Sequence, residues 1–341
     1  MQAERRLVIG SWPGRTFAWN SFIASFCEAL EAAGCEVVDV EDPRSLQTRI
    51  DVLHIHWPEQ IFWKGGGAAR LTYRTVSVLR ALARLRRSGV RLVWMVHNLR
   101  PHDESGARRP LWAYLSRRLA RMVDGFMTLS PATVPVVRAA FPALAGKPFA
   151  DAWHPAYTDI PAVEAPVRDP AAIRYAFLGQ VRPYKGVEEL VTAFAANADP
   201  RHRLVIAGDA APPEFAQRIA ALGARDDRID VELRRLSDAE MATAAAAADI
   251  IVLPFNNYLH SGSMLYALSC GRPVLTPSTA FAEGLAKVVG ADWVRTYQGK
   301  LAPHHLDFTP PTGSADLGLL SWSALGEAAT ALYRRLASTA A

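Results

Sequence analysis

Two short segments in the second half of the chain combine residues that suit a bound diphosphate. The first is the loop from Gly179 to Gly186, which carries Arg182 and Lys185. Its glycines let the backbone approach a ligand closely, and its two cations project from one loop. The second is Ser261-Gly262-Ser263, which opens an apolar helical pattern. The first N–H groups of a helix have no partner within the helix and lie at the positive end of its dipole, so this segment also suits a phosphate.

Polar residues in the first half of the chain follow two expected strands. The group consists of His54, His56, Glu59, His97, Asn98, His102 and Asp103. Because ligands bind beyond the carboxyl ends of parallel strands, these residues are placed where a site would form. Burial inside a sheet is an alternative for His54 and His56 that needs no function. We expect no metal, because no two of these histidines form an i,i+4 pair on a helix and no cysteine joins them.

Short apolar runs alternate with helical patterns along the whole chain. The strands that we expect span residues 7–9, 36–40, 52–56, 92–97 and 125–129 in the first half, and 175–178, 204–207, 229–233, 250–253 and 273–276 in the second. Helical patterns between them include residues 19–33, which end at Gly34. This alternation is typical of βαβ units and predicts an α/β protein with parallel sheets.

A proline-rich segment, residues 151–172, separates the two halves. Prolines at this density resist both helix and central strand, so we place a domain boundary between about 155 and 160. Residues 1–155 then form a first domain and residues 156–321 a second one. The last helical pattern, within residues 322–341, is expected to pack back on the first domain.

Charge is unevenly distributed along the 341 residues. Residues 1–155 hold 21 Lys and Arg against 13 Asp and Glu, whereas residues 156–341 hold 17 against 20. A helix over residues 68–87 would place Leu71, Val78, Leu82 and Leu85 on one stripe and the basic side chains of Arg80, Arg84 and Arg87 opposite. This cationic amphipathic pattern predicts peripheral contact with an anionic membrane surface, with an ordinary solvated face as the alternative. We expect no nucleic-acid partner, because no recognised binding module is present.

The cysteines Cys27, Cys35 and Cys270 show neither metal-ligand spacing nor a disulfide framework, which favours a reducing compartment. The sequence has no signal-peptide pattern and no apolar run of roughly 18 residues. We therefore expect a cytoplasmic protein, in peripheral contact with the inner face of the plasma membrane.

Four motifs in the second half carry a family resemblance. They read GQVRPYKGVEELVTAF, RLVIAGDA, SDAEMATAAAAADIIVLPF and SGSMLYALSCGRPVL. Over about residues 173–290 the chain resembles the donor-binding half of group 1 glycosyltransferases of the GT-B fold. The resemblance implies two Rossmann-like domains facing a cleft, with the first domain binding the acceptor. It also implies that Arg182 and Lys185 hold the diphosphate of a nucleotide-sugar donor.

The chain departs from the family at two positions. Retaining members carry two glutamates eight positions apart, where this chain has Tyr258 and Tyr266. The usual contacts of those carboxylates with the donor sugar and ribose therefore do not carry over. We expect the loop before the second diphosphate segment, including Asn256, to take over these contacts. The residues expected at the donor sugar or nucleotide are Gly179, Asn257, Tyr258, His260 and Tyr266.

The first-half segments DVLHIHWPE and LVWMVHNLRPHDE resemble bacterial exopolysaccharide β-mannosyltransferases that act on lipid-linked oligosaccharides. We therefore hypothesise an inverting transfer of a hexose, mannose from GDP-mannose, to a lipid-linked oligosaccharide or exopolysaccharide precursor. Such a transfer needs a base for the acceptor hydroxyl, for which Glu59 and Asp103 are the candidates, with His97 orienting the sugar. The diphosphate segments would stabilise the leaving group without a metal or other cofactor.

Three alternatives remain open at this point. One is a transferase that uses a UDP-sugar carrying glucose or glucuronate. Another is a non-catalytic module that binds a nucleotide-sugar but lacks a working base. The third is an NAD-dependent dehydrogenase, because Gly10 and Gly14 follow the first strand and Asp39 lies near the end of the second. This third alternative is disfavoured, since GSWPGR is not G-x-G-x-x-G and Trp12 and Pro13 occupy the turn that a pyrophosphate would need.

Overall fold

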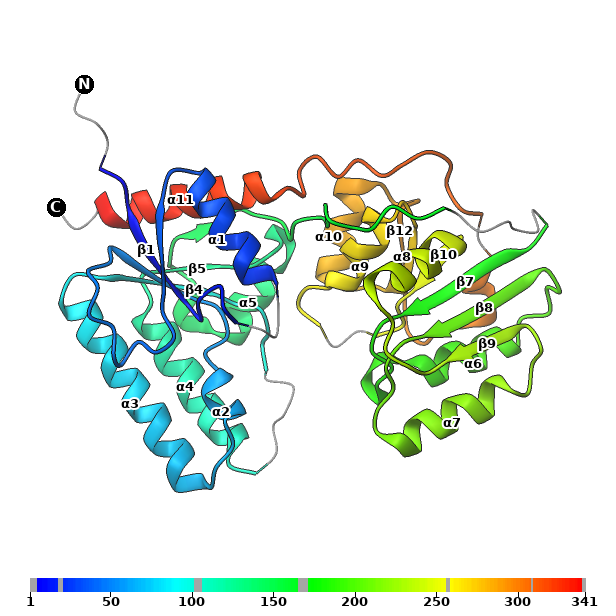
Figure 1. Ribbon diagram of the computed structural model, residues 1–341, viewed down its shortest axis with the longest axis horizontal. Helices are drawn as coiled ribbons and strands as arrows, with labels where there is room; N and C mark the ends of the chain where they lie inside the picture. The colour runs from blue at the N-terminus through cyan, green and yellow to red at the C-terminus, as the bar shows by residue number, and fades with distance from the viewer. Residues whose placement is uncertain are drawn as a thin grey trace. The chain divides into compact units, whose positions relative to one another are not determined.

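The protein forms two compact units, each built around its own sheet (Figure 1). The computed structural model describes residues 5–17, 21–100, 106–164, 171–255, 258–307 and 309–338. The first unit comprises residues 1–154 and 320–341, and the second comprises residues 155–319. The chain therefore leaves the first unit one residue before the predicted boundary and returns to it at Leu320.

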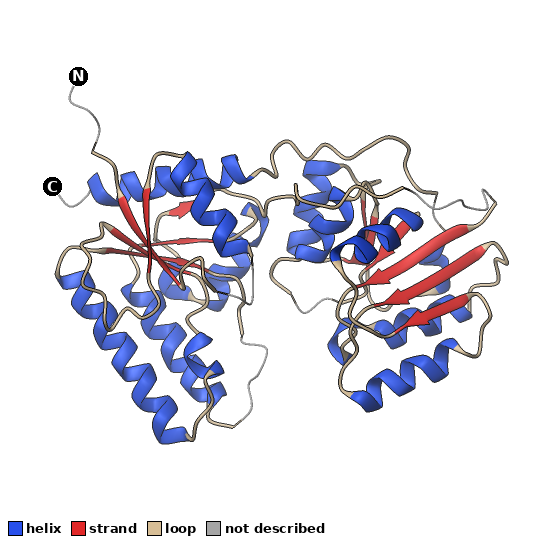
Figure 2. Cartoon of the chain, viewed as in Figure 1, coloured by secondary structure: helices blue, strands red, loops and turns tan. Residues whose placement is uncertain are grey.

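The described residues of the first unit form six parallel strands in the order β2-β1-β3-β4-β5-β6. Figure 2 shows the strands in red and the helices in blue. The strands are β1 (Val8–Trp12), β2 (Glu36–Asp39), β3 (Val52–Ile55), β4 (Arg91–Met95), β5 (Gly125–Met127) and β6 (Phe149–Ala150). The helices are α1 (Phe22–Ala32), α2 (Gln60–Trp63), α3 (Ala68–Arg87), α4 (Arg108–Met122), α5 (Val134–Ala140) and α11 (Trp322–Ser338). The order reverses between β1 and β3, so the ends of these two strands form the switch point where ligands bind in open parallel sheets.

Hydrophobic patterning explains the layers of this unit. All four residues of β3 are buried, as expected for an interior strand of a parallel sheet covered on both faces. The predicted apolar stripe of α3 is buried, and its predicted basic face, including Arg80 and Arg84, is exposed. The amphipathic prediction for this helix is confirmed. Within the described ranges, no helix combines the length and apolar character that crossing a bilayer requires.

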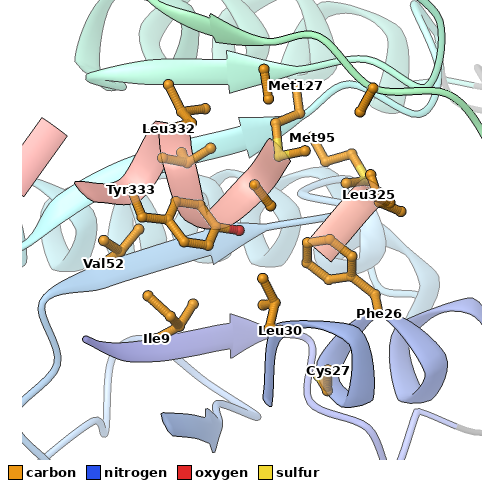
Figure 3. Close-up of a cluster of buried hydrophobic side chains, with 14 of the residues drawn as sticks. Ile9, Phe26, Cys27, Leu30, Val52, Met95, Met127, Leu325, Leu332 and Tyr333 are labelled. Atoms are coloured by element: carbon orange, nitrogen blue, oxygen red, sulfur yellow. The ribbon is translucent and has the colours of Figure 1, made fainter. Parts of the chain in front are cut away.

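Helix α11 completes the core of the first unit, although it follows the second unit in the chain. It packs against α1 and contributes Leu325, Leu332 and Tyr333 to the buried cluster shown in Figure 3. The Tyr333 hydroxyl lies 2.6 Å from Nδ1 of His54, and both side chains are fully buried. The C-terminal helix thus contributes both apolar area and a buried hydrogen bond to the sheet.

In the part of the second unit that the structure describes, six parallel strands follow the order β12-β11-β10-β7-β8-β9. The strands are β7 (Ile173–Leu178), β8 (His202–Ala207), β9 (Ile229–Glu232), β10 (Ile250–Val252), β11 (Val274–Pro277) and β12 (Val294–Tyr297). The helices are α6 (Val187–Ala195), α7 (Pro213–Gly223), α8 (Asp238–Ala247), α9 (Gly262–Ser269) and α10 (Ala280–Val289). The order reverses between β7 and β10, which makes their carboxyl ends the switch point of this sheet.

The sequence patterns missed two strands and placed several strand ends differently. The missed strands are β6, with two residues, and β12, with four. Both lie at an edge of their sheet. Their sequences, FA and VRTY, lack the run of three or more apolar residues or the apolar–polar alternation that identified the other strands. The first strand extends to Trp12, three residues beyond the predicted end.

We predict that Gly326→Ala destabilises the first unit. A glycine inside a helix normally costs about 1 kcal/mol relative to alanine, so this change would ordinarily stabilise α11. Here a Cβ would lie 2.4 Å from the backbone oxygen of Ala29 in α1. We expect a net loss of about 1–3 kcal/mol from overpacking, measured by denaturant unfolding. Glu327→Ala at the exposed neighbouring position is the control. A more stable Gly326→Ala variant would contradict the close contact.

Candidate active site

The two loops at the switch point of the second unit touch each other through a glycine. The loop after β7 ends with a 3-10 turn, Pro183–Lys185, and Gly186 then caps α6 with a φ of +70°. A Cβ at Gly186 would lie 2.5 Å from the carbonyl oxygen of Pro254, in the loop after β10. Only glycine combines this left-handed backbone with so close an approach. The first predicted diphosphate segment is therefore held against the loop that leads to the second.

Arg182 forms an ion pair that the sequence patterns did not predict. Its guanidinium donates to the carboxylate of Asp209 at 2.6 Å and to the backbone oxygen of the same residue at 2.6 Å. Asp209 lies in the loop after β8, and its side chain is 55% exposed. Because exposed ion pairs contribute about 0–1 kcal/mol, a diphosphate with more negative charge can replace this carboxylate. Asp209 thus orients the Arg182 guanidinium, and an anion bound at the predicted diphosphate site would compete with this carboxylate.

Lys185 lies in a partly buried position beside an aromatic ring. Its Nζ is 4.9 Å from the ring centroid of Phe255, within the range of a cation–π contact. Burial lowers the pKa of Lys185, and the nearby charge of Arg182 lowers it further. An anionic ligand would offset both effects, since an opposite charge favours the ammonium form.

Helix α9 begins at the second predicted diphosphate segment. The Ser261 hydroxyl oxygen accepts a hydrogen bond from the backbone N–H of Met264 at 3.3 Å, and this side chain is 4% exposed. Ser261 therefore acts as the N-cap of α9. A phosphate at this helix start would bind through the backbone N–H groups of Gly262 and Ser263, because the first N–H groups of a helix lack intrahelical partners.

The side chain of Tyr258, at a position where retaining family members carry a glutamate, is hydrogen-bonded to neighbouring threonines. Its hydroxyl accepts a hydrogen bond from the Thr279 hydroxyl at 3.1 Å and lies 3.4 Å from the Thr276 hydroxyl oxygen. These threonines lie at the end of β11 and at the start of α10. Tyr258 thus connects the loop after β10 to the next strand and to the start of α10.

The other expected donor-side residues lie around the same loop. The Tyr266 ring meets the Tyr157 ring edge to face at 5.7 Å, and burial raises the pKa of the Tyr266 hydroxyl. The His260 ring meets Phe281 edge to face at 5.7 Å. Gly179 follows β7 directly with a φ of +111°. Asn256 and Asn257 lie outside the described residues.

The predicted histidines of the first unit gather at the carboxyl ends of β3 and β4. Nδ1 of His56 lies 3.2 Å from Nε2 of His97, and the His97 ring stacks on Trp57 with centroids 4.1 Å apart. The backbone N–H of His56 donates to the carbonyl oxygen of Trp12 at the end of β1, so this group sits at the switch point of its sheet.

His54 and His56 are both fully buried. Burial lowers the pKa of His56 to about 3 and the pKa of His54 well below its ordinary value. Both rings are therefore neutral at physiological pH. His54, hydrogen-bonded to Tyr333, is a buried core residue, which was the alternative to a functional role. His56 instead makes a hydrogen-bond contact with one ring nitrogen of His97.

Glu59 is a buried carboxyl at the start of α2, with 4% of its surface exposed. Burial raises its pKa to about 7, against the smaller opposing effects of its backbone hydrogen bond and of a hydrogen bond with the Asn98 side chain. A carboxyl that titrates near neutral pH suits a general base. The other candidate base, Asp103, and the neighbouring His102 lie outside the described residues.

No group of three or more His, Cys, Asp or Glu side chains within the described ranges could hold a metal ion. The four described histidines of the first unit's site, His54, His56, His97 and His154, instead contact aromatic rings, as His154 does with Phe22 at 5.6 Å.

Comparisons with known proteins identify the family. Residues 172–297 match the family model described as "Glycosyl transferases group 1". The chain is 32% identical over 293 residues to the GDP-mannose:glycolipid 4-beta-D-mannosyltransferase of Xanthomonas campestris pv. campestris, covering 83% of this chain and 79% of the relative. The chain belongs to the group 1 glycosyltransferases. It is therefore a glycosyltransferase, as the sequence motifs predicted.

Solved glycosyltransferase structures show the same GT-B fold. Sucrose-phosphate synthase from Thermosynechococcus elongatus superposes with a TM-score of 0.62 at 16% identity, covering 98% of this chain and 100% of that one. A glycosyltransferase from Rickettsia africae superposes with a TM-score of 0.61 at 11% identity, covering 98% and 99%. The GT-B prediction is confirmed, and the dehydrogenase alternative is excluded by the family.

We predict that Arg182→Ala and Lys185→Ala each weaken nucleoside diphosphate binding at least about tenfold, because each removes a charged contact with the diphosphate. Calorimetric titration with GDP and UDP measures the effect. Arg201→Ala is the matched control, since Arg201 is an exposed arginine of the same unit paired with Asp199 at 2.6 Å. Equal binding by all three variants would contradict the assigned diphosphate site.

Proposed function

We propose that this glycosyltransferase moves mannose from GDP-mannose to a glycolipid acceptor, with inversion at the anomeric carbon. The observation that carries the proposal is the 32% identity, over most of both chains, to a protein named for this reaction. The similarity extends beyond residues 172–297, the part that matches the family model, into the first unit. Because acceptor contacts belong to the first unit in this proposal, similarity there supports a related acceptor.

Inversion follows from the chemistry of donor and product. In GDP-mannose the sugar is α-linked to the diphosphate, so a β-mannoside forms by a single attack from the opposite face. That attack requires a base for the acceptor hydroxyl but no carboxylate on the donor side. The tyrosines at positions 258 and 266 are consistent with this mechanism, because neither position supplies a carboxylate and the Tyr258 hydroxyl is hydrogen-bonded to Thr279.

Glu59 is the base in this proposal. Its pKa of about 7 leaves a large fraction ionised at physiological pH while keeping the carboxylate basic enough to accept a proton. Its hydrogen bond with Asn98 connects it to the segment that carries His97, which would orient the sugar. Asp103 remains the alternative base, and the variants below distinguish the two.

The leaving GDP would be stabilised by fixed charges. Arg182 and Lys185 place two cations on one loop, and the start of α9 adds backbone N–H groups and the positive end of a helix dipole. This arrangement can neutralise the diphosphate as the glycosidic bond breaks, without a metal ion in the proposal.

The acceptor in this proposal is a lipid-linked oligosaccharide used as an exopolysaccharide precursor. The relative's name specifies a glycolipid acceptor. The exposed basic face of α3 supports a peripheral contact with an anionic membrane, on the cytoplasmic side where nucleotide-sugars are available.

We predict that the purified protein consumes GDP-mannose, and not UDP-glucose or UDP-glucuronate, when a lipid-linked oligosaccharide is supplied. The anomeric configuration of the product, read from its one-bond carbon–proton coupling, is expected to be β. An α product would exclude the inverting mechanism, whereas preferential use of a UDP-sugar would exclude the donor. No transfer to any lipid-linked acceptor, with GDP still bound, would favour the non-catalytic alternative.

We predict that Glu59→Gln lowers kcat by about 10²–10⁴-fold, the range expected for loss of a general base, with unchanged GDP affinity. In the parent protein kcat should rise with pH and level off above about pH 7, because the base must be ionised. Asp103→Asn should keep most of the activity. The reverse result would assign the base to Asp103.

Stability provides a second readout for Glu59. The carboxyl titrates near 4.5 in the unfolded chain and near 7 in the folded one, so the unfolded state loses its proton first as pH rises. The favourable contribution of the protonated group is complete below about pH 4.5 and is lost as pH rises through 7. Glu59→Gln should therefore melt at a higher temperature than the parent at pH 8 and at a similar temperature at pH 4. A lower melting temperature at pH 8 would indicate a structural role.

A further inference from the structure

A groove runs along α3, and none of its lining residues belongs to the strand-end site of the first unit described above. Its volume is about 560 Å³, and it lies between α3 and the segment that follows β2. The polar and aromatic side chains lining this α3 groove are Arg44, Tyr73, Ser77, Arg80, Arg84 and Arg87. Four of these six are arginines, so the groove is suited to an anion.

The lining follows one face of the helix. Residues 73, 77, 80, 84 and 87 recur at intervals of three and four, which places them on one stripe. At 1.5 Å per residue this stripe is about 21 Å long. The Arg84 guanidinium donates to the backbone oxygen of Arg44 at 3.1 Å, so the opposite wall is hydrogen-bonded to the helix. The groove is therefore a defined feature of the first unit.

The positive charge inside the groove is only partly neutralised. Arg44 pairs with Asp42 at 2.5 Å. Within the described residues, no carboxylate forms a salt bridge with Arg80, Arg84 or Arg87.

Neighbouring arginines of the same region behave differently. Arg86, on another face of α3, pairs with Asp124 at 3.2 Å, and Arg91 at the start of β4 approaches the same carboxylate at 3.7 Å. These two arginines thus have an acidic partner, whereas the three α3 arginines that line the groove form no salt bridge among the described residues and are available to an external anion. Guanidinium groups match phosphate oxygens in a two-pronged geometry, which favours phosphate as that anion.

Exposed aromatic side chains accompany the groove. Tyr73, in its lining, is 69% exposed, and Trp63, at the end of the adjacent α2, is 50% exposed. Tyrosine and tryptophan with basic neighbours are typical of surfaces that sit at the headgroup level of a bilayer. This combination favours a phosphate on a membrane lipid over a phosphate on a nucleic acid.

We infer that the α3 groove is a binding site for the phosphate of an anionic phospholipid headgroup, separate from the donor diphosphate site. The inference deepens the proposed function, since it names the group on the membrane that the first unit recognises. A defined binding site differs from general electrostatic attraction to a charged surface, because lipid binding to the site saturates and a soluble headgroup competes for it.

Vesicle co-sedimentation tests the site. The parent protein should bind vesicles of phosphatidylcholine with about 30% phosphatidylglycerol at least tenfold better than vesicles of phosphatidylcholine alone. The double variant with Arg80→Gln and Arg84→Gln should weaken this binding about 30-fold, because each arginine contributes about fivefold and the two effects multiply. The control is Arg225→Gln with Arg235→Gln, which removes the same charge from exposed positions of the second unit and should leave binding unchanged. Equal losses in both double variants, or no loss in the first, would overturn the inference.

A competition experiment distinguishes a defined phosphate site from diffuse electrostatic attraction to the vesicle surface. Glycerol 3-phosphate should release the parent protein from phosphatidylglycerol vesicles at concentrations where sodium chloride of equal ionic strength leaves it bound. If the two solutes release the protein equally, no defined phosphate site exists.

Two further readouts keep this result distinct from the proposed function. The groove variant should retain GDP binding and its transfer rate with acceptor dispersed in detergent, while its transfer to acceptor in phosphatidylglycerol vesicles falls. If its KM for the dispersed acceptor rises as well, the groove binds the acceptor's own phosphate, and the phospholipid assignment is overturned. If the parent protein binds vesicles as expected but transfers no mannose, the groove stands and the proposed reaction fails.

Discussion

Parallel pairing of every described strand with its neighbours is the constraint on which both halves of this protein depend. All carboxyl ends in a sheet lie at one edge, and the loops that leave them collect side chains from distant parts of the chain. In the second unit the order reversal places the ends of β7 and β10 next to each other, and Gly186 lets their loops touch. In the first unit the same reversal brings the ends of β1 and β3 together beside His56.

Much of this arrangement could be predicted from the sequence, because each predicted feature is local. The amphipathic pattern of α3 and the patterns of most interior strands depend on residues within a few positions of one another. The ion pair between Arg182 and Asp209 could not be predicted in this way. It joins loops 27 residues apart that meet only because β7 pairs with β8. Likewise, the burial that raises the pKa of Glu59 is a property of the assembled sheet and not of the segment DVLHIHWPE.

Both candidate sites hold charged groups where the fold disfavours their charge. Burial raises the pKa of Glu59, which disfavours its carboxylate, and lowers the pKa of Lys185, which disfavours its ammonium form. Perturbations of this kind are common at functional sites and also occur in structural networks. Here they fall on a candidate base and on a candidate diphosphate ligand, which are the groups whose charge a reaction would use. Arg182, on the same loop as Lys185, forms an ion pair with Asp209.

Helix α11 lies in the core of the first unit but follows the whole second unit along the chain. During synthesis, the ribosome therefore finishes every strand of the second unit before it makes Leu332 and Tyr333. The second unit can fold as soon as it has emerged, whereas β3, made much earlier, must wait with His54 unpaired until α11 arrives. The first unit, although most of its chain is made first, thus cannot complete its core until the whole second unit has been translated.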